Sequence, residues 1–378
     1  MQILYILFIL PNVNSLFKNI LSKKLHNINV HNVENDKIKN QDYKYNLNWY
    51  VIGEKTKFKN NKAQKITIWN NDYVVWRNNT DYYAMDNYCS HKGASLAIGK
   101  ISNNNIICPY HGYEFNSNGT LCKVPGLNFC NTPIHNQNSY NIIEKNGLVY
   151  LNIINNIFYK PYEINIYEEP EAKDSNFKSI LINTNFNAYG RIVSENSLDV
   201  MHIGFVHTFG NRINPSPITE KPPYIVNDYP YHYKTNYYYE AGENSIVKKI
   251  FNISYLIIEN EFILPHTTIA RVIFGNFTST IVTNTLPINN THSHLYVKTY
   301  RNFWINNKKF LGNIIENIAN IITRNMMIET VNQDKVIIES IKPEYMDGKF
   351  NMKYYKLQNV YKTFYKKFIK NNSYIDRD

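Results

Sequence analysis

Short apolar runs separated by asparagine-rich turns fill the first half of the chain after residue 45. Residues 65–69 and 73–76 are rich in β-branched and aromatic side chains, and turn residues lie between the two runs. This pattern is typical of short antiparallel strands packed as a sandwich. It predicts a last strand over residues 148–153, followed by a linker that contains two prolines.

The second half of the chain mixes two hydrophobic periods. Strand-like runs occupy residues 255–258, 268–274 and 296–304, and helical spacing is found near residues 189–207 and 307–338. Strands and helices that do not alternate regularly indicate an α+β fold.

Apolar and aromatic residues recur at helical spacing near the end of the chain, with lysines between them. The apolar positions are Tyr354, Leu357, Tyr361, Phe364, Tyr365 and Phe368. The pattern predicts a helix that docks on the core and turns a basic face to solvent. A membrane-surface or acidic-partner role for that face is the alternative.

The beginning of the chain gives a weaker signal. Residues 1–10 are almost wholly apolar, which is too short to span a bilayer. No positive segment precedes them and no small-residue cleavage site follows. We expect residues 1–45 to form a poorly ordered leader, for which a targeting or membrane-associating role stays open.

Composition and charge exclude some classes of protein. A chain of 378 residues with 43% hydrophobic content allows about two to three domains with a substantial core. The formal net charge is +11, but the lysines are scattered and form no basic stripe, so we expect no nucleic-acid binding. No phosphate-cradling glycine loop or nucleotide fingerprint is present.

Two cysteine–histidine pairs carry the strongest chemical signal. Cys89 precedes His91 by two residues, and Cys108 precedes His111 by three. A Rieske [2Fe-2S] cluster needs two thiolates on one iron and two neutral imidazoles on the other. A glycine follows each histidine and allows the backbone to turn sharply around such a cluster. A structural zinc site is the alternative, although its loops usually pair like ligands.

A second constellation lies about ninety residues downstream, where Asp199, His202 and His207 are spaced by two and four residues. Two imidazoles and one carboxylate on one face of Fe(II) leave open positions for oxygen and substrate. Five residues advance an ideal helix by about 500°, so the two histidines would stand about 140° apart. We therefore predict a π-type widening or a helix end between them. Asp199 and His202 are expected to share a helix face. An amphipathic helix with partly buried histidines is the alternative.

These motifs resemble a known superfamily. Residues 89–94 and 108–113 look like the two cluster loops of Rieske proteins, and residues 196–207 resemble the mononuclear iron motif of Rieske non-haem iron oxygenases. Respiratory-type Rieske proteins have an extra cysteine in each loop, where this chain has Ala94 and Tyr110. The resemblance is therefore to the oxygenase or ferredoxin type, and it is closest to members related to pheophorbide a oxygenase and chlorophyllide a oxygenase.

The resemblance implies an α+β architecture. An antiparallel β Rieske domain would cover residues 46–155, and a catalytic domain with a curved antiparallel sheet and iron-bearing helices would cover residues 156–378. The implied cofactors are a [2Fe-2S] cluster held by Cys89, His91, Cys108 and His111, and a mononuclear Fe(II) held by His202, His207 and Asp334.

Asp334 is assigned by resemblance, because residues 330–340 look like the acidic helix of vanillate demethylase-like and pheophorbide oxygenase-like members. Glu329 and Glu339 are the fallback ligands. The alternative for Asp334 is an ordinary charged residue on a solvated helix face, with no role in metal binding.

The resemblance also implies how the two metal sites communicate. Asp199 would hydrogen-bond His202 and His111 of a neighbouring subunit, which fixes the imidazoles and offers a short electron route. Asn196 matches an asparagine often seen near the iron, and the implied assembly is a homotrimer.

The resulting hypothesis is an enzyme that oxidises an apolar cyclic substrate with O2, by hydroxylation, demethylation or ring opening. A tetrapyrrole is one candidate substrate. With no flavin or nicotinamide motif in the chain, a ferredoxin or reductase must supply the electrons. A sterol-type Rieske oxygenase or desaturase, and a Rieske electron carrier with a vestigial iron site, are the alternatives. Cys122 and Cys130 are expected to be reduced thiols in an intracellular protein of the cytoplasm or a plastid.

Overall fold

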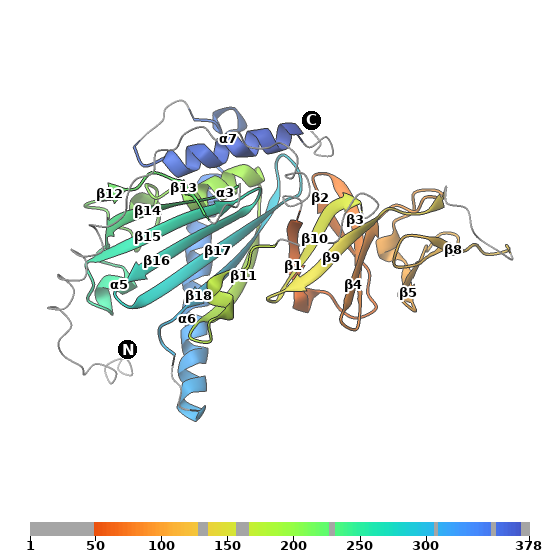
Figure 1. Ribbon diagram of the computed structural model, residues 1–378, viewed down its shortest axis with the longest axis horizontal. Helices are drawn as coiled ribbons and strands as arrows, with labels where there is room; N and C mark the ends of the chain where they lie inside the picture. The colour runs from red at the N-terminus through yellow and green to blue at the C-terminus, as the bar shows by residue number, and fades with distance from the viewer. Residues whose placement is uncertain are drawn as a thin grey trace. The chain divides into compact units, whose positions relative to one another are not determined.

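A computed structural model of the chain provides the coordinates, and its ribbon is drawn in Figure 1. The residues that the structure describes are 49–127, 135–155, 166–226, 231–305, 309–348 and 353–371. The expectations for residues 1–45 and for Cys130 lie outside them.

The first half of the described chain forms antiparallel sheets, as predicted. One sheet has six strands in the order β1-β10-β9-β4-β3-β2, and a second has four in the order β5-β6-β7-β8. The six strands are β1 (Trp49–Glu54), β2 (Gln64–Ile68), β3 (Asn71–Asn78), β4 (Asp81–Asp86), β9 (Ser139–Lys145) and β10 (Leu148–Asn155). The four are β5 (Lys100–Ser102), β6 (Asn105–Ile107), β7 (Glu114–Phe115) and β8 (Leu121–Lys123). Short 3-10 turns, η2 (Lys55–Lys57) and η3 (Leu96–Ile98), join them.

Strand β3 shows why these sequences fold into layers. Val74, Val75 and Trp76 are all fully buried, although alternate residues of a strand point to opposite faces. Val75 packs into one apolar cluster with other strands of the six-stranded sheet, whereas Val74 and Trp76 pack into another. The second cluster contains Cys89 and Cys108, so the cysteine loops are anchored on a rigid apolar base.

The second half of the chain forms an antiparallel sheet in the order β11-β18-β17-β16-β15-β14-β12, with β13 paired to β14 (Figure 1). Its strands are β11 (Lys178–Phe186), β12 (Thr219–Glu220), β13 (Tyr224–Ile225), β14 (His232–Glu240), β15 (Tyr255–Ile263), β16 (Thr267–Phe274), β17 (Phe277–Pro287) and β18 (Ser293–Arg301). The three strand-like runs predicted from the sequence fall in β15, β16 and β18, which confirms the α+β class.

Helices cover this sheet and its ends. They are α2 (Pro170–Lys173), α3 (Gly190–Leu198), α4 (Ile203–Val206), α5 (Ile246–Lys249), α6 (Lys309–Ile338) and α7 (Lys356–Asn371), with a 3-10 turn η6 (Pro343–Tyr345). Helix α6 packs Val331 and Ile338 into an apolar cluster with residues of β11 and β18. The predicted C-terminal helix is confirmed, because Leu357, Tyr361 and Tyr365 are buried in the core. None of the described helices is long and apolar enough to cross a membrane.

The expectation that Asp199 and His202 share a helix face was wrong. The chain forms α3, leaves the helical conformation at Asp199 with φ −84° and ψ 115°, and begins α4 after His202. The extended backbone at Asp199 separates the two helices, so Asp199 and His202 do not share a helix face.

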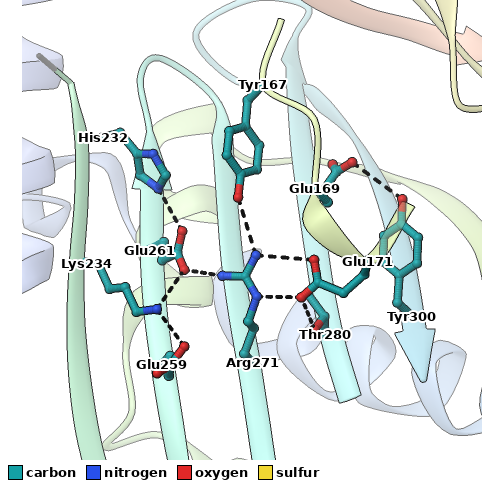
Figure 2. Close-up of polar contacts among 10 residues, drawn as sticks. All are labelled: Tyr167, Glu169, Glu171, His232, Lys234, Glu259, Glu261, Arg271, Thr280 and Tyr300. Carbon is teal, nitrogen blue, oxygen red and sulfur yellow. Dashed lines mark hydrogen bonds and ion pairs between the residues drawn. The ribbon is translucent and has the colours of Figure 1, made fainter. Parts of the chain in front are cut away.

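Successive side chains along each strand point to opposite sides of the large sheet, and the two faces that they form differ in chemistry. On one face, buried ionisable side chains from β14, β15 and β16 meet side chains of residues 167–171, which lie against this face (Figure 2). Arg271 is at the centre, where it donates hydrogen bonds to Glu171 over 2.5 Å and to Glu261. Glu261 also contacts His232 Nε2 at 2.7 Å, and Glu171 accepts a hydrogen bond of 2.8 Å from Thr280. The opposite face of the sheet lines a cavity.

Candidate metal centres and substrate cavity

The two cysteine loops have the same backbone hydrogen-bond pattern. In each loop, the backbone N–H of the cysteine donates to the carbonyl of the residue five positions later. The N–H of the residue four positions after the cysteine donates back to the cysteine carbonyl. The N···O distances are 2.9 Å for Cys89 to Ala94, 2.8 Å for Gly93 to Cys89, 2.8 Å for Cys108 to Tyr113 and 3.1 Å for Gly112 to Cys108. This residue is Gly93 in one loop and Gly112 in the other, with φ of +70° and +72°. Glycine suits the position because a positive φ costs other residues free energy.

These matched loops bring the four candidate ligands together. Cys89 and Cys108 are each only 3% exposed, and burial raises the pKa of the Cys89 thiol to about 11, with a further contribution from Cys108. The rings of His91 and His111 meet with centroids 4.7 Å apart. The buried Nδ1 of His111 has no hydrogen-bond partner in the described chain. Two inner thiols beside two outer imidazoles fit a Rieske cluster, which needs the thiols deprotonated.

Aromatic rings flank both imidazoles. Tyr113 stacks on His91 with centroids 4.5 Å apart and an angle of 9° between the rings. Tyr110 is 63% exposed and lies 3.7 Å from His111 between centroids. These rings restrict the orientation of the imidazoles at the surface of the protein.

The second site forms where α4 begins and ends. His202 precedes the helix and His207 follows it directly, so the predicted helix end between the two histidines is confirmed. Their Nε2 atoms lie 3.1 Å apart. Asp334 reaches them from α6, with Oδ1 at 3.3 Å from His202 Nε2 and 3.4 Å from His207 Nε2.

This triad fits a divalent metal ion. Ligand atoms about 2.1 Å from a metal stand about 3.0 Å apart at right angles and about 3.4 Å apart at tetrahedral angles, and the three observed separations fall at or between these values. Asp334 Oδ1 is buried and accepts no hydrogen bond in the described chain. Burial opposes protonation of both rings. At His202 the Asp334 carboxylate outweighs burial and raises the pKa, whereas at His207 burial prevails and lowers the pKa.

The triad has a support that sequence reasoning missed. Gln333 Oε1 lies 3.1 Å from His207 Nδ1, and Gln333 Nε2 donates to Glu329 over 2.9 Å. Phe209 stacks on His207 with centroids 4.9 Å apart. Gln333 precedes Asp334 in the sequence, and no motif marks it. An amide oxygen at Nδ1 places the proton there and leaves Nε2 as the metal-binding atom.

The fallback carboxylates are engaged elsewhere. Glu329 contacts Gln333, as described above. Glu339 accepts a hydrogen bond of 2.7 Å from the backbone N–H of Asn187 and lies 3.7 Å from Lys335 Nζ. Among the three carboxylates considered from the sequence, Asp334 is the one that contacts both histidines.

Asp199 lies beside the triad but contacts its backbone. Its Oδ1 accepts the N–H groups of Met201 at 2.7 Å and His202 at 3.4 Å. Burial raises the pKa of Asp199, and the nearby His202 acts against that shift. His202 Nδ1 is buried and has no partner in the described chain. Asn196 lines the cavity near the triad, and its carbonyl accepts the Asp199 N–H at 3.1 Å.

A cavity of about 300 Å³ opens from the triad between the large sheet and α6. Apolar side chains from β15 to β18 form much of the sheet side, including Ile258, Val272 and Ile281. Met326 and Met327 line it from α6. The volume is at the lower end of the range for sites that enclose organic ligands.

Comparison with known proteins agrees with this geometry. The chain matches the Rieske [2Fe-2S] domain family over residues 48–134. It is 23% identical over 205 residues to the oxygenase component of 3-ketosteroid-9-alpha-monooxygenase from Rhodococcus rhodochrous, covering 53% of this chain and 49% of that protein. It is 25% identical over 171 residues to chloroplastic chlorophyllide a oxygenase from Oryza sativa subsp. japonica, covering 42% of this chain and 28% of that protein. The chain thus spans half or less of the length of these relatives.

A solved structure of dicamba monooxygenase bound to 3,6-dichlorosalicylic acid shares the fold, with a TM-score of 0.72 and 16% identity. The match covers 86% of this chain and 97% of the other. The resemblance to Rieske oxygenases is therefore confirmed: this chain carries a Rieske [2Fe-2S] domain and shares the fold of this monooxygenase structure.

Proposed function

We propose that this chain is the oxygenase component of a Rieske-type system, which uses O2 and externally supplied electrons to oxidise an apolar cyclic substrate. The observation that carries the proposal is the meeting of His202, His207 and Asp334 at one end of an apolar cavity. A Rieske electron carrier would have no need of such a triad or of an enclosed cavity beside it.

Two sets of residues would hold the cofactors. Cys89, His91, Cys108 and His111 would hold the [2Fe-2S] cluster, and the triad would hold Fe(II) by one face. When bound, these groups supply one-electron storage and activation of O2. The protein holds the ligands, excludes water with the apolar cavity walls and positions the substrate near the triad.

We propose two positioning roles. Gln333 would fix the His207 tautomer through Nδ1. Asp199 would link His202 to His111 of a neighbouring copy in a homotrimer, and the unpartnered Nδ1 atom of His202 supports this assignment. Asn196 would line the substrate path beside the triad.

A ferredoxin or reductase would deliver electrons at the exposed His91 side of the cluster loops. The positive net charge of the chain would favour an acidic donor. We place the protein inside the cell, in the cytoplasm or a plastid, because an intracellular donor must reach it. The boundary between a Rieske domain and a catalytic domain is proposed at residues 155–156.

The reaction would be an oxidation of a ring compound by hydroxylation, demethylation or ring opening. Relatives are named for steroid and chlorophyllide substrates. A tetrapyrrole is the finer candidate from the sequence, but a cavity of about 300 Å³ favours a smaller ring system.

A single-turnover experiment tests this proposal. The cluster is reduced with dithionite without oxygen, excess reductant is removed, and O2 is added to the iron-loaded protein with and without Asp334→Ala. We expect cluster reoxidation coupled to O2 consumption in the unaltered protein and much slower reoxidation in the variant. Equal rates would contradict an oxygenase role for the triad.

A further inference from the structure

We infer that the cavity binds a neutral, elongated ring compound that carries a hydrogen-bonding group at each end. This inference rests on the proposed function, because it names the class of substrate that the same cavity would take. Two buried polar atoms without partners, their positions on the sheet and the charges around the cavity carry the argument.

The first atom is Asn260 Oδ1. Asn260 lines the cavity from β15 and is only 2% exposed. Its Nδ2 donates to the Leu198 carbonyl at 3.3 Å, which fixes the orientation of the amide, because a flipped amide would set two oxygens against each other. Oδ1 is buried and has no partner among the residues that the structure describes. This amide oxygen can only accept a hydrogen bond, so an O–H or N–H group of a ligand would supply the donor that it lacks.

The second atom is Thr299 Oγ1. Thr299 lines the cavity from β18, is 1% exposed and has no hydrogen-bond partner for its hydroxyl in the described chain. Two other cavity threonines are satisfied, because Thr268 and Thr283 share a hydrogen bond of 2.5 Å. The Thr299 hydroxyl can donate or accept, so it suits a ligand carbonyl or hydroxyl.

The two atoms belong to one row across the sheet. Asn260 pairs with Ala270, Ala270 with Ile281, and Ile281 with Thr299. Three strand spacings of about 4.8 Å separate the ends of the row by roughly 14 Å along the backbone. The two middle residues are apolar. A ligand that reaches both ends must therefore be long and must present an apolar middle.

The charges around the cavity disfavour a substrate with a carboxylate. No lysine, arginine or glutamate of the described chain lines it, whereas Asp199 and Asp334 do. Arg301, two residues after Thr299 on the same face of β18, is buried. Its guanidinium donates to Phe303 O and Asn320 Oδ1, each at 2.7 Å. The carboxylates of Asp199 and Asp334 would already balance the charge of an Fe(II) held by the triad, so a ligand anion buried here would lack a countercharge, which is costly.

Calorimetric titration of the oxidised holoenzyme with a set of steroids tests the inference without any turnover. Testosterone has a hydroxyl at one end and a ketone at the other, androst-4-ene-3,17-dione has two ketones, 5α-androstane has neither, and 3-oxoandrost-4-ene-17β-carboxylic acid carries an anion. Testosterone should bind most tightly. The dione should bind roughly three- to tenfold more weakly because Asn260 then lacks a donor, and the hydrocarbon and the acid at least tenfold more weakly.

Two variants test which residue contacts which end of the ligand. Asn260→Leu should remove the preference for testosterone over the dione. Thr299→Val should weaken both ketosteroids by a similar factor and leave the preference unchanged. Thr323→Val is the matched control, because Thr323 lines the same cavity but its hydroxyl already donates to Ala319 O at 2.7 Å. It should preserve the ratio of the two affinities.

The inference is overturned if the acid binds as tightly as testosterone, if no neutral steroid binds, or if the hydrocarbon binds as tightly as testosterone. A testosterone preference that survives Asn260→Leu also overturns it. The proposed function stands or falls separately, because reoxidation of the cluster by O2 is measured in the single-turnover experiment and not in these titrations.

Discussion

The two faces of the large sheet are built from alternate residues of the same strands. They differ in whether their buried polar groups have partners within the described chain. On the network face, the buried charges are paired across strands (Figure 2). On the cavity face, Asn260 Oδ1 and Thr299 Oγ1 have no partner in the described chain, and Asp334 Oδ1 above them accepts no hydrogen bond. Strand β15 shows the contrast between two adjacent residues, since both carboxylate oxygens of Glu261 are paired whereas Oδ1 of Asn260 has no partner in the described chain.

The difference separates groups that stabilise the fold from groups that we propose to bind a ligand. A buried charge that loses its partner costs several kcal/mol, so pairing on the network face serves stability. Unpartnered buried polar groups are rare in native proteins and call for a reason. The metal ion and the substrate that we propose on the cavity face would supply that reason.

The largest effect is expected on the cavity face, from Asp334→Ala. Removing the carboxylate leaves two imidazoles, and we expect loss of the mononuclear iron and of turnover by at least about 100-fold. The visible spectrum of the cluster should be unchanged. Glu339→Gln is the control, because Glu339 contacts Asn187 and Lys335, and it should retain the iron. Iron content and O2 consumption measure the effect, and an iron-replete Asp334→Ala would refute the ligand assignment.

The largest effect on the network face is expected from Arg271→Met. It leaves Glu171 and Glu261 buried without their shared cation and should lower the free energy of unfolding by about 3–5 kcal/mol. Denaturant titration measures this loss. Lys248→Met removes an ion pair with the exposed Glu243 and should cost less than about 1 kcal/mol. Similar losses for both variants would show that the network is no more important than a surface pair.

A smaller effect on the metal is expected from Gln333→Leu. Without the oxygen at Nδ1, the His207 ring loses its fixed tautomer, and iron affinity should fall by about 10- to 100-fold. Competition with a chelator measures the affinity. Gln333→Glu keeps an acceptor and should largely restore it, and Asn332→Leu on the exposed side of α6 should have no effect. An unaltered affinity in Gln333→Leu would show that the contact is incidental.

The smallest effect concerns pH on the network face. Burial opposes ionisation of Glu261, but the His232 hydrogen bond and the charges of Arg271 and Lys234 outweigh it, so the pKa is lowered from 4.5. This carboxylate therefore contributes stability above about pH 4.5 that is lost as pH falls through its pKa in the folded protein. Glu261→Gln should cost about 2 kcal/mol at pH 7, and the difference from the unaltered protein should narrow below about pH 4. A difference that stays constant down to pH 3 would contradict the lowered pKa.

Local spacing made part of this site predictable. The cluster pairs lie within a few residues of each other, and the helical phase of His202 and His207 indicated a helix end that the structure contains. The break at Asp199 was missed because an extended residue between two helices leaves no clear mark in the hydrophobic pattern.

Contacts between distant residues could not be derived in this way. Glu171 contacts Thr280 and Arg271 across about one hundred residues, and Asn260 is aligned with Thr299 only through the register of four strands. Whether a polar residue of a strand faces a cavity or a charge network depends on that register. The role of Gln333 likewise depends on how α6 packs over the sheet.

The most direct test of the central claim is spin-resonance spectroscopy of the reduced, iron-loaded protein with nitric oxide. We predict a signal from nitric oxide on a mononuclear Fe(II) in addition to that of the reduced Rieske cluster, and loss of the first signal alone in Asp334→Ala. A cluster signal with no mononuclear signal in the unaltered protein, or zinc in the triad of protein purified without added metal, would contradict the account.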